Sequence, residues 1–330
     1  IEEAGIHSGD SSCTLPPITL GPDVIAKVKE ATEAIARGTG VRGLINIQFA
    51  YVSENLFVIE ANPRASRTVP FVSKATGVQL AKAAVMIGLG KSIAELKAEG
   101  YLPDSMDGAS LPQDTAIAVK AAVLPFSRFR TPEGVVVDSL LSPEMRSTGE
   151  VMGLDTHYDT AFAKAQAGAG SPLPTEGKVF VSVANHDKRN VIIYAKMLEQ
   201  LGFEIVSTGG TADVLRRNGV NSTVASKFAE ANGQHSIVDM VRNGEIDLIL
   251  NTPAGGAARS DGYEIRAAAV SVGCPVMTTI SEFAAAVQAI TALREHSWGI
   301  ISLQEHNEYL HTASSGEQED SNQVREGELS

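Results

Sequence analysis

Hydrophobic positions recur at helical spacing near the start of the chain and then alternate with polar ones. Residues 22–37 carry valine, isoleucine and alanine three or four positions apart, with glycines soon after them, which predicts a helix. The next two runs, 43–52 and 56–62, alternate as strands do, and the polar residues between them predict a hairpin loop at 53–55. Shorter helical patterns lie at 78–87, 92–98 and 160–166.

Strand-like and helical patterns alternate in the second half of the chain. We expect strands at 178–184, 203–207, 247–251 and 275–279, and helices at 188–200, 212–217 and 282–294. This alternation with short connections predicts a parallel sheet flanked by helices, and such sheets bind ligands at the carboxyl ends of their strands. The small, proline-bearing stretch 167–177 predicts a linker, so we place a domain boundary near residue 170.

Composition and charge narrow the class of protein. The chain has 330 residues and a formal net charge of -12, so it lacks the basic surface that binds nucleic acids or anionic membranes. Its 2 cysteines are far apart, and no apolar run reaches the roughly 18 residues that span a bilayer. We therefore expect a cytoplasmic protein with no nucleic-acid partner and no membrane partner. Because residue 1 is isoleucine, we also expect a C-terminal fragment, ending in a disordered acidic tail at 312–330.

The predicted hairpin has one apolar face and one polar face. With a loop at 53–55, residues whose numbers sum to about 108 lie opposite each other, so Gln48 faces Glu60. Alternation then directs the odd-numbered isoleucines and phenylalanines, including Phe57 and Ile59, to a core, and it places Asn62 with Gln48 and Glu60 on the other face. Such oxygen ligands with a single carboxylate suit Mg²⁺, whose other positions go to phosphate and water.

Two arginines follow this polar face within a few residues. Arg64 and Arg67 could hold phosphate oxygens while a metal ion neutralises others, a combination that suggests phosphoryl transfer. Spacing alone favours a plainer interpretation, an exposed hairpin face with ordinary surface arginines. The wider sequence changes that balance.

The hairpin region closely resembles the C-terminal part of an ATP-grasp domain, in the run VRGLINIQFAYVSENLFVIEANPRASRTVPFVSKATGVQLAKAA. More narrowly, it resembles the second ATP-grasp copy of carbamoyl-phosphate synthetase large subunits, as do the runs IEEAGIHSGDSSCTLPP and LSPEMRSTGEVMG. The resemblance implies an α/β protein in which residues 1–170 form the C-terminal part of an ATP-grasp fold, and residues 171–311 form a second domain.

The resemblance also implies site residues, ions and partners. Arg64 and Arg67 would be catalytic and hold phosphate groups, the ligands of Mg²⁺ or Mn²⁺ would be Gln48, Glu60 and Asn62, and ATP would be bound by Gly5, Ile6, His7, Ser8, Gln48 and Glu60. K⁺ would be a further ion. The family makes carbamoyl phosphate from bicarbonate, glutamine-derived ammonia and two ATP, for arginine and pyrimidine biosynthesis. This part would phosphorylate carbamate, with a glutaminase small subunit as partner in an oligomer of heterodimers.

A second group of polar residues lies in the later half of the chain. The strand at 203–207 runs into Thr208, two glycines and Thr211, where N–H groups, hydroxyls and a helix N-terminus could surround an anion. Lys188 opens the preceding helix, Lys227 lies in a loop, and Asn251 ends a later strand at the same edge. Glycines after a strand are often only turn formers, but four segments ending on one edge favour a phosphate site.

This later half resembles the methylglyoxal-synthase-like domain that follows the second ATP-grasp copy in the same family, a doubly wound parallel-sheet domain. Its phosphate-binding positions match Lys188, Thr208, Thr211, Lys227 and Asn251, which implies UMP or IMP as an allosteric effector. Pro253 departs from the hydroxyl of many bacterial relatives.

The family's ornithine site implies a further group of residues, namely Glu2, Asp10 and Thr278. Ala121 stands where an acidic residue is expected there, so ornithine regulation does not carry over directly. A lost carboxylate partner would weaken binding of an amino group by about 1 to 3 kcal/mol.

Two alternatives remain open. One is a ligand-sensing module that binds a nucleotide monophosphate, with the ATP-grasp part as a scaffold, because the lysine-bearing parts that cover the adenine are absent from this chain. The other is a methylglyoxal-synthase-like enzyme, which the long preceding segment disfavours. In either case we expect the chain alone to have no synthetase activity.

Overall fold

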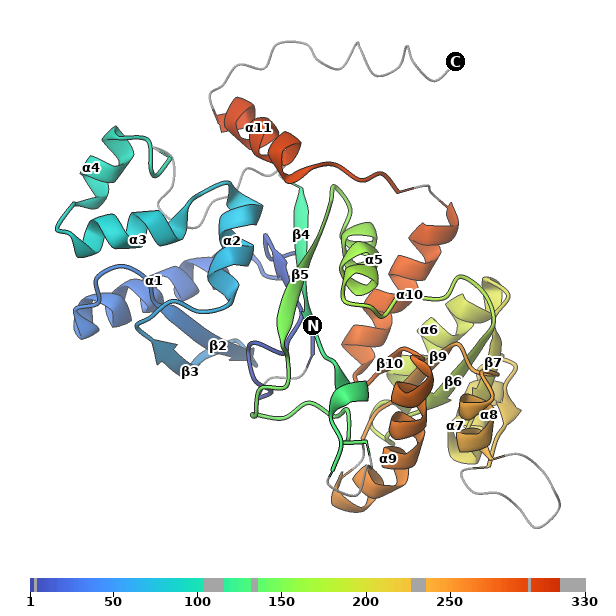
Figure 1. Ribbon diagram of the computed structural model, residues 1–330. Coiled ribbons are helices and arrows are strands. Elements are labelled where there is room, and N and C mark those ends of the chain that lie inside the picture. The colour runs from blue at the N-terminus through green and yellow to red at the C-terminus, as the bar shows by residue number, and fades with distance from the viewer. Residues whose placement is uncertain are drawn as a thin grey trace, which may run out of the picture. The chain divides into compact units, whose positions relative to one another are not determined.

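A computed structural model describes residues 1–2, 5–103, 116–131, 136–226, 236–253, 255–295 and 298–314, and the chain divides into two compact units (Figure 1). Unit 1 consists of Ile1–Cys13 and Ala118–Trp298, and unit 2 of Thr14–Ile117 and Gly299–Ser330. The units interleave along the chain and do not meet at one boundary near residue 170, because helix α5 (Tyr158–Gly168) packs against helix α10 (Ile280–Glu295).

Unit 2 is a hairpin with helices around it. Helix α1 (Pro22–Thr39) has proline at its start and ends at Gly40, whose φ of 63° suits a residue without a side chain, so the predicted helix is confirmed. Three further helices follow the hairpin, α2 (Thr68–Thr76), α3 (Leu80–Gly88) and α4 (Ile93–Ala98). Sequence analysis did not predict α2, which has Pro70 in its first turn, where a helix tolerates proline.

The end of the described chain returns to unit 2. Helix α11 (Leu303–Ser314) packs against α2, and the buried His306 places its Nε2 3.2 Å from the carbonyl oxygen of Ala75. Residues 312–314, predicted as the start of a disordered tail, belong to this helix, and 315–330 lie outside the described residues.

The hairpin consists of β2 (Asn46–Val52) and β3 (Asn55–Asn62), joined by a turn of two residues. Ser53 and Glu54 have φ values of 49° and 64°, as the tight turn of a twisted hairpin requires, so the predicted three-residue loop was wrong. A bulge beside Gln48, where Ile59 is the extra residue, restores the expected pairing of Gln48 with Glu60.

The bulge also alters which side chains share a face. Phe57 pairs with Ala50 and lies on the face of Gln48, although its odd number predicted the opposite face. Its side chain is 55% exposed, and Ile59 is 46% exposed. The expectation that both are directed to a core was therefore wrong for this chain.

A small sheet has the strand order β1-β4-β5, formed by β1 (Cys13–Leu15), β4 (Ile117–Val123) and β5 (Gly149–Asp155), and β5 and all of β4 after Ile117 belong to unit 1. Helix α5 lies against β5 at Gly153, where an added Cβ would clash with the carbonyl oxygen of Ala161. Sequence analysis predicted neither β4 nor β5, because the chain around them is rich in proline and glycine.

The larger sheet of unit 1 is parallel, as predicted. Its strands are β6 (Lys178–Ser182), β7 (Glu204–Ser207), β8 (Thr223–Val224), β9 (Leu248–Asn251) and β10 (Val276–Met277), in the order β10-β9-β6-β7-β8. The chain continues from β6 to β7 on one side and returns to β9 on the other. The strand order therefore reverses between β6 and β9, and this switch point is where open α/β sheets bind ligands.

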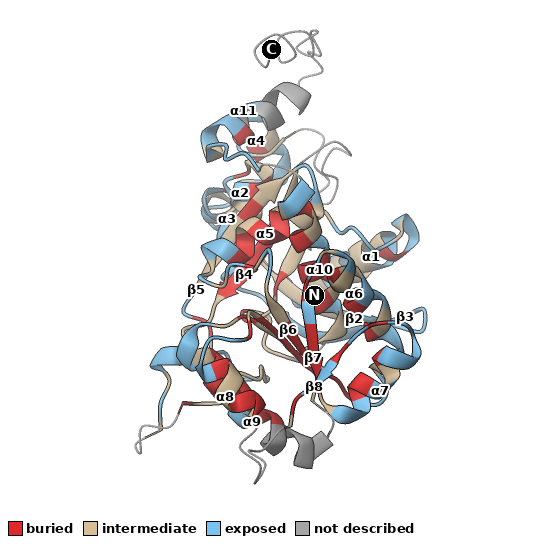
Figure 2. Cartoon of the chain, turned by 90° about the vertical axis from the view of Figure 1, so that its right-hand side faces the viewer, coloured by how far each residue is buried: buried red, intermediate tan, exposed pale blue. Residues whose placement is uncertain are grey.

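Helices cover both faces of this sheet (Figure 1). They are α6 (Lys188–Gln200), α7 (Gly209–Arg217), α8 (Ile237–Arg242), α9 (Gly255–Val272) and α10. A buried cluster that includes Phe180, Ile237, Ile249 and Ile265 joins α8 and α9 to one face, and most of β6 and β7 is buried (Figure 2). On the other face α6 packs against α7 and α10. Among the described residues, no helix is both long and apolar enough to cross a membrane.

Candidate functional sites

The first candidate site is the polar face of the hairpin in unit 2. Gln48 lies opposite Glu60 and Asn46 opposite Asn62, so their Cβ atoms are about 4.5 to 5.5 Å apart across the strands. Glu60 is exposed, and the three amide side chains are half-buried. One carboxylate and several amide oxygens therefore share a surface that a ligand can reach.

The two predicted arginines follow this face at the end of β3. The backbone N–H of Arg64 donates to the carbonyl oxygen of Asn62 at 2.8 Å, which folds the chain back beside the hairpin. Arg67 directly precedes α2, and both arginine side chains are exposed. Their planar guanidinium groups suit phosphate oxygens.

The donor set of the hairpin fits a hard divalent cation. Mg²⁺ and Mn²⁺ prefer oxygen ligands and leave several positions to water and phosphate, so one carboxylate with neighbouring amides is adequate. Within the described part of the chain, no three His, Cys, Asp or Glu side chains form a cluster suited to a metal ion. A site for a softer metal such as zinc is thus not found among these residues.

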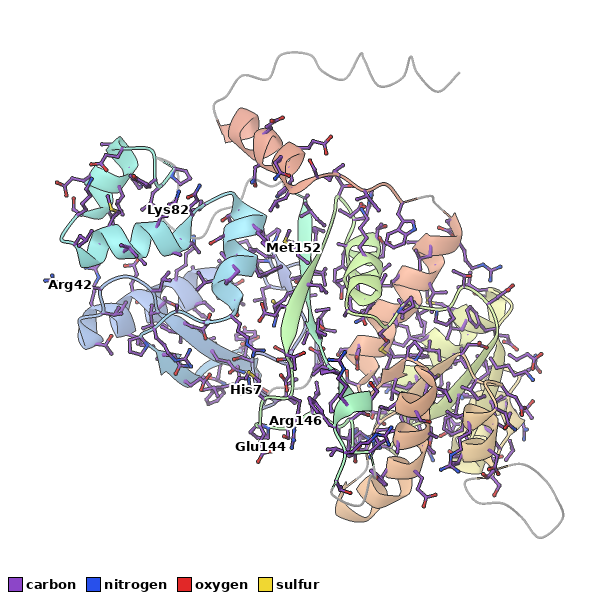
Figure 3. The ribbon with its side chains drawn as sticks, viewed as in Figure 1. His7, Arg42, Lys82, Glu144, Arg146 and Met152 are labelled. Atoms are coloured by element: carbon purple, nitrogen blue, oxygen red, sulfur yellow. The ribbon has the colours of Figure 1, made fainter. Side chains whose placement is uncertain are left out.

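The predicted ATP-binding residues Gly5, Ile6, His7 and Ser8 belong to unit 1, whereas the hairpin belongs to unit 2. Figure 3 shows His7 near Glu144 and Arg146. The backbone N–H of His7 donates to Ser142 O at 2.9 Å, and the buried Asp10 carboxylate accepts the backbone N–H groups of Arg146 and Ser147 at 2.7 and 2.9 Å. These bonds fix the turn that contains residues 5–10 against residues 142–147.

Unit 1 also contains a cavity of about 270 Å³, whose lining includes Glu2, Asp10, Ala121 and Thr278. The residues that the resemblance assigned to ornithine thus lie around one cavity. Glu282 adds a carboxylate to the same lining, and burial, then the negative charge of Glu2, raises its pKa to about 8. Sequence analysis missed Glu282 because it resembles an ordinary helix-capping glutamate, with its N–H donating to Thr279 Oγ1 at 3.1 Å.

The third candidate site lies at the carboxyl ends of β6, β7 and β9, and we call it the anion cradle. Ser182 Oγ lies 3.3 Å from Thr208 Oγ1, which lies 3.4 Å from Thr211 Oγ1 at the start of α7. The ammonium of Lys188 approaches Gly210, where an added Cβ would lie 3.2 Å from Nζ. Glycine at this position therefore leaves room for the ammonium of the lysine.

Asn251 completes the described part of the anion cradle. It ends β9 beside Ser182, and its Nδ2 lies 3.5 Å from the carbonyl oxygen of Ser182. Four of the five predicted phosphate-binding residues thus lie at the same edge of the sheet, and Lys227 lies outside the described residues. Sequence analysis missed Ser182, which is marked only by its position at the end of a strand.

Two family models match two separate parts of the chain. Residues 2–96 match the family described as the carbamoyl-phosphate synthase L chain, ATP binding domain, and residues 190–278 match the MGS-like domain. The carbamoyl phosphate synthase large chain of Kocuria rhizophila is 69% identical over 312 residues, which are 94% of this chain and 28% of that protein. The large chain of Streptomyces coelicolor is 59% identical, again over 94% of this chain and 28% of its own length.

This chain therefore spans a little more than a quarter of the length of these relatives. Within that span, the similarity covers both the hairpin with its arginines and the anion cradle. The chain belongs to the carbamoyl phosphate synthase large-chain family, as a segment that contains part of an ATP-binding domain and an MGS-like domain.

Proposed function

We propose that this chain is the part of a glutamine-dependent carbamoyl-phosphate synthetase that phosphorylates carbamate with ATP. The observation that carries the proposal is the pairing of Gln48 with Glu60 across the hairpin, with Asn62 on the same face and two exposed arginines directly after it. The complete enzyme would use bicarbonate, two ATP and ammonia from a glutaminase small chain, in an oligomer of such pairs. Mg²⁺ or Mn²⁺ would accompany ATP, with K⁺ as a further ion.

The residues of this chain would act by positioning and by charge. Glu60, Gln48 and Asn62 would hold the divalent ion, which when bound neutralises charge on the phosphate groups. Arg64 and Arg67 would donate hydrogen bonds to the oxygens of the phosphate group during its transfer to the carbamate oxygen. Phosphoryl transfer needs no covalent intermediate with the protein. The hairpin face would therefore contribute mainly by positioning the metal ion and the phosphate group.

The test uses the complete enzyme with Glu60→Gln, which keeps the size of the side chain and removes its charge. We expect the rate of carbamoyl phosphate synthesis to fall by about a thousandfold or more, since several kcal/mol of transition-state stabilisation depend on the metal site. The matched control is Glu54→Gln, which removes a carboxylate from the turn of the same hairpin. Near-normal synthesis by Glu60→Gln, or an equal loss in the control, would contradict the proposal.

We further propose that the anion cradle binds the phosphate of a regulatory nucleotide monophosphate, either UMP or IMP. Support comes from the hydroxyls of Thr208 and Thr211, the neighbouring ammonium of Lys188 and the position of all three at the carboxyl edge of the parallel sheet. If this proposal held and the synthetase proposal failed, the chain would be a ligand-sensing module.

Calorimetry on the chain tests the effector proposal. A hydrogen bond to a charged group is worth roughly 1.5 to 3 kcal/mol, so Thr211→Ala should weaken binding about tenfold to a hundredfold. Thr223→Ala, an exposed position on the edge strand of the same sheet, is the control and should bind as the wild type does. Absence of binding by the wild-type chain to millimolar UMP and IMP would refute the proposal.

A further inference from the structure

One buried arginine lies directly beneath the anion cradle. The side chain of Arg266, on α9, is 0% exposed. Its Nε and Nη2 donate to the two carboxylate oxygens of Asp138, each at 2.7 Å, and its Nη1 donates to Asn251 Oδ1, also at 2.7 Å. A buried charge is costly unless it is paired, and the bidentate pair with Asp138 offsets that cost.

The contact with Arg266 fixes how the amide of Asn251 is oriented. An arginine side chain has donors and no acceptor, so the oxygen of the amide must face Arg266 and its nitrogen must face the other way. On that side Nδ2 lies 3.5 Å from the carbonyl oxygen of Ser182, at the switch point of the sheet. An amide nitrogen carries two hydrogens, so one N–H remains to donate to an anion in the cradle.

Two neighbouring residues maintain this arrangement. An added Cβ on Gly262 would clash with the guanidinium group of Arg266 and with Asn251 Oδ1, so only glycine permits their close approach. Tyr263 donates its hydroxyl to the carbonyl oxygen of Val136 at 2.6 Å, which anchors the segment that carries Asp138. Gly262 thus allows Arg266 to reach Asn251, and Tyr263 helps to fix the segment of Asp138, with which Arg266 is paired.

We propose that Arg266 is a positioning residue of the anion cradle: fixed by Asp138, it turns Asn251 so that the amide N–H donates to a bound phosphate monoester. The proposal rests on the proposed effector function of the cradle and adds a specific requirement to it. Loss of the Arg266–Asp138 pair would leave Asn251 free to present its oxygen, which repels an anion. Phosphate affinity thus depends on two residues that do not touch the phosphate.

The experiment measures the affinity of the whole 330-residue chain for UMP and IMP by calorimetry. Asn251→Ala and Arg266→Met should each weaken nucleotide binding about tenfold to a hundredfold. The double variant should bind the nucleotide as tightly as the weaker-binding of the two single variants, because both changes remove the same hydrogen bond. The control is Arg216→Met, in the last turn of α7, which removes two hydrogen bonds to the carbonyl oxygen of Ser222 and none to Asn251.

A milder variant covers the case in which Arg266→Met does not fold. Asp138→Asn keeps the shape of the carboxylate, and it should weaken binding about tenfold while the chain stays folded by circular dichroism. The inference would be overturned if Asp138→Asn and Arg266→Met bound the nucleotides as tightly as the wild type. It would also be overturned if the losses in binding free energy of Arg266→Met and Asn251→Ala added fully in the double variant. A wild-type chain that binds neither UMP nor IMP would refute the effector function itself, and the inference with it.

Discussion

Replacing Glu282 by glutamine should make unit 1 more stable at pH 9 and leave it nearly unchanged at pH 5. Burial, then the charge of Glu2, raises the pKa of this carboxyl from 4.5 to about 8 in the folded chain. Between these two values the unfolded chain has lost the proton and the folded chain keeps it, so the free energy of unfolding falls as the pH rises through this window. The contribution of the wild-type Glu282 side chain to the free energy of unfolding is therefore fully present below pH 4.5 and lost above about pH 8.

The size of the effect follows from the shift in pKa. At about 1.4 kcal/mol for each unit, the full shift would correspond to about 5 kcal/mol. Glu282 is partly exposed where it lines the cavity, and solvent there screens its charge, so we expect roughly 2 to 4 kcal/mol. Glutamine can still accept the backbone N–H of Thr278, which now donates to Glu282 Oε2 at 2.9 Å, so the variant should lose little else.

Urea unfolding, followed by the fluorescence of Trp298, measures this difference because Trp298 belongs to unit 1 and is the sole tryptophan of the chain. The control is Glu295→Gln, which removes an exposed carboxylate from the end of the same helix and should behave alike at both pH values. A difference between Glu282→Gln and the wild type that is the same at pH 5 and pH 9 would refute the reasoning.

Three further predictions concern packing, the cavity and the chain by itself. Gly153→Ala should lower the free energy of unfolding by about 1 to 3 kcal/mol or more, because its methyl group would overlap the backbone of α5. Gly168→Ala is the control in the same urea unfolding experiment and should not lower it, because its methyl group would meet only Val151 at ordinary contact distance. If the cavity of unit 1 binds ornithine despite Ala121, ornithine should raise the thermal midpoint more at pH 8.5 than at pH 6, because its ammonium pairs best with ionised Glu282, and an equal shift at both pH values would contradict this pairing. The chain alone should form no ADP in response to carbamate, and detectable carbamate-dependent ADP formation would contradict this.

The facing pair on the hairpin could be predicted even though the loop was not. Sequence analysis assumed one residue too many in the loop, and the bulge at Ile59 adds that residue back before the strands reach Gln48 and Glu60. No local pattern marks such a bulge, because it depends on how the strands twist and pack. The error therefore appeared in the side chains between the turn and the bulge, such as Phe57.

The anion cradle could be predicted because its residues stand at strand ends, where the rules for parallel sheets bring them together. The pair of Arg266 and Asp138, which positions Asn251, could not be predicted from the sequence. Arg266 and Asp138 are 128 positions apart, and Asp138 lies in a segment with no regular pattern. Glu282 was missed for the opposite reason, since its local pattern has a complete explanation as a helix cap.

The most direct test of the central claim separates the two ATP-dependent steps of the complete enzyme carrying Glu60→Gln. In the proposed complete enzyme, carbamate phosphorylation would run backwards as the formation of ATP from carbamoyl phosphate and ADP, and bicarbonate-dependent hydrolysis of ATP would report the other step. We predict that the variant loses ATP formation by about a thousandfold and keeps bicarbonate-dependent hydrolysis within about twofold of the wild type. Retained ATP formation together with lost bicarbonate-dependent hydrolysis would contradict the assignment of this hairpin to carbamate phosphorylation.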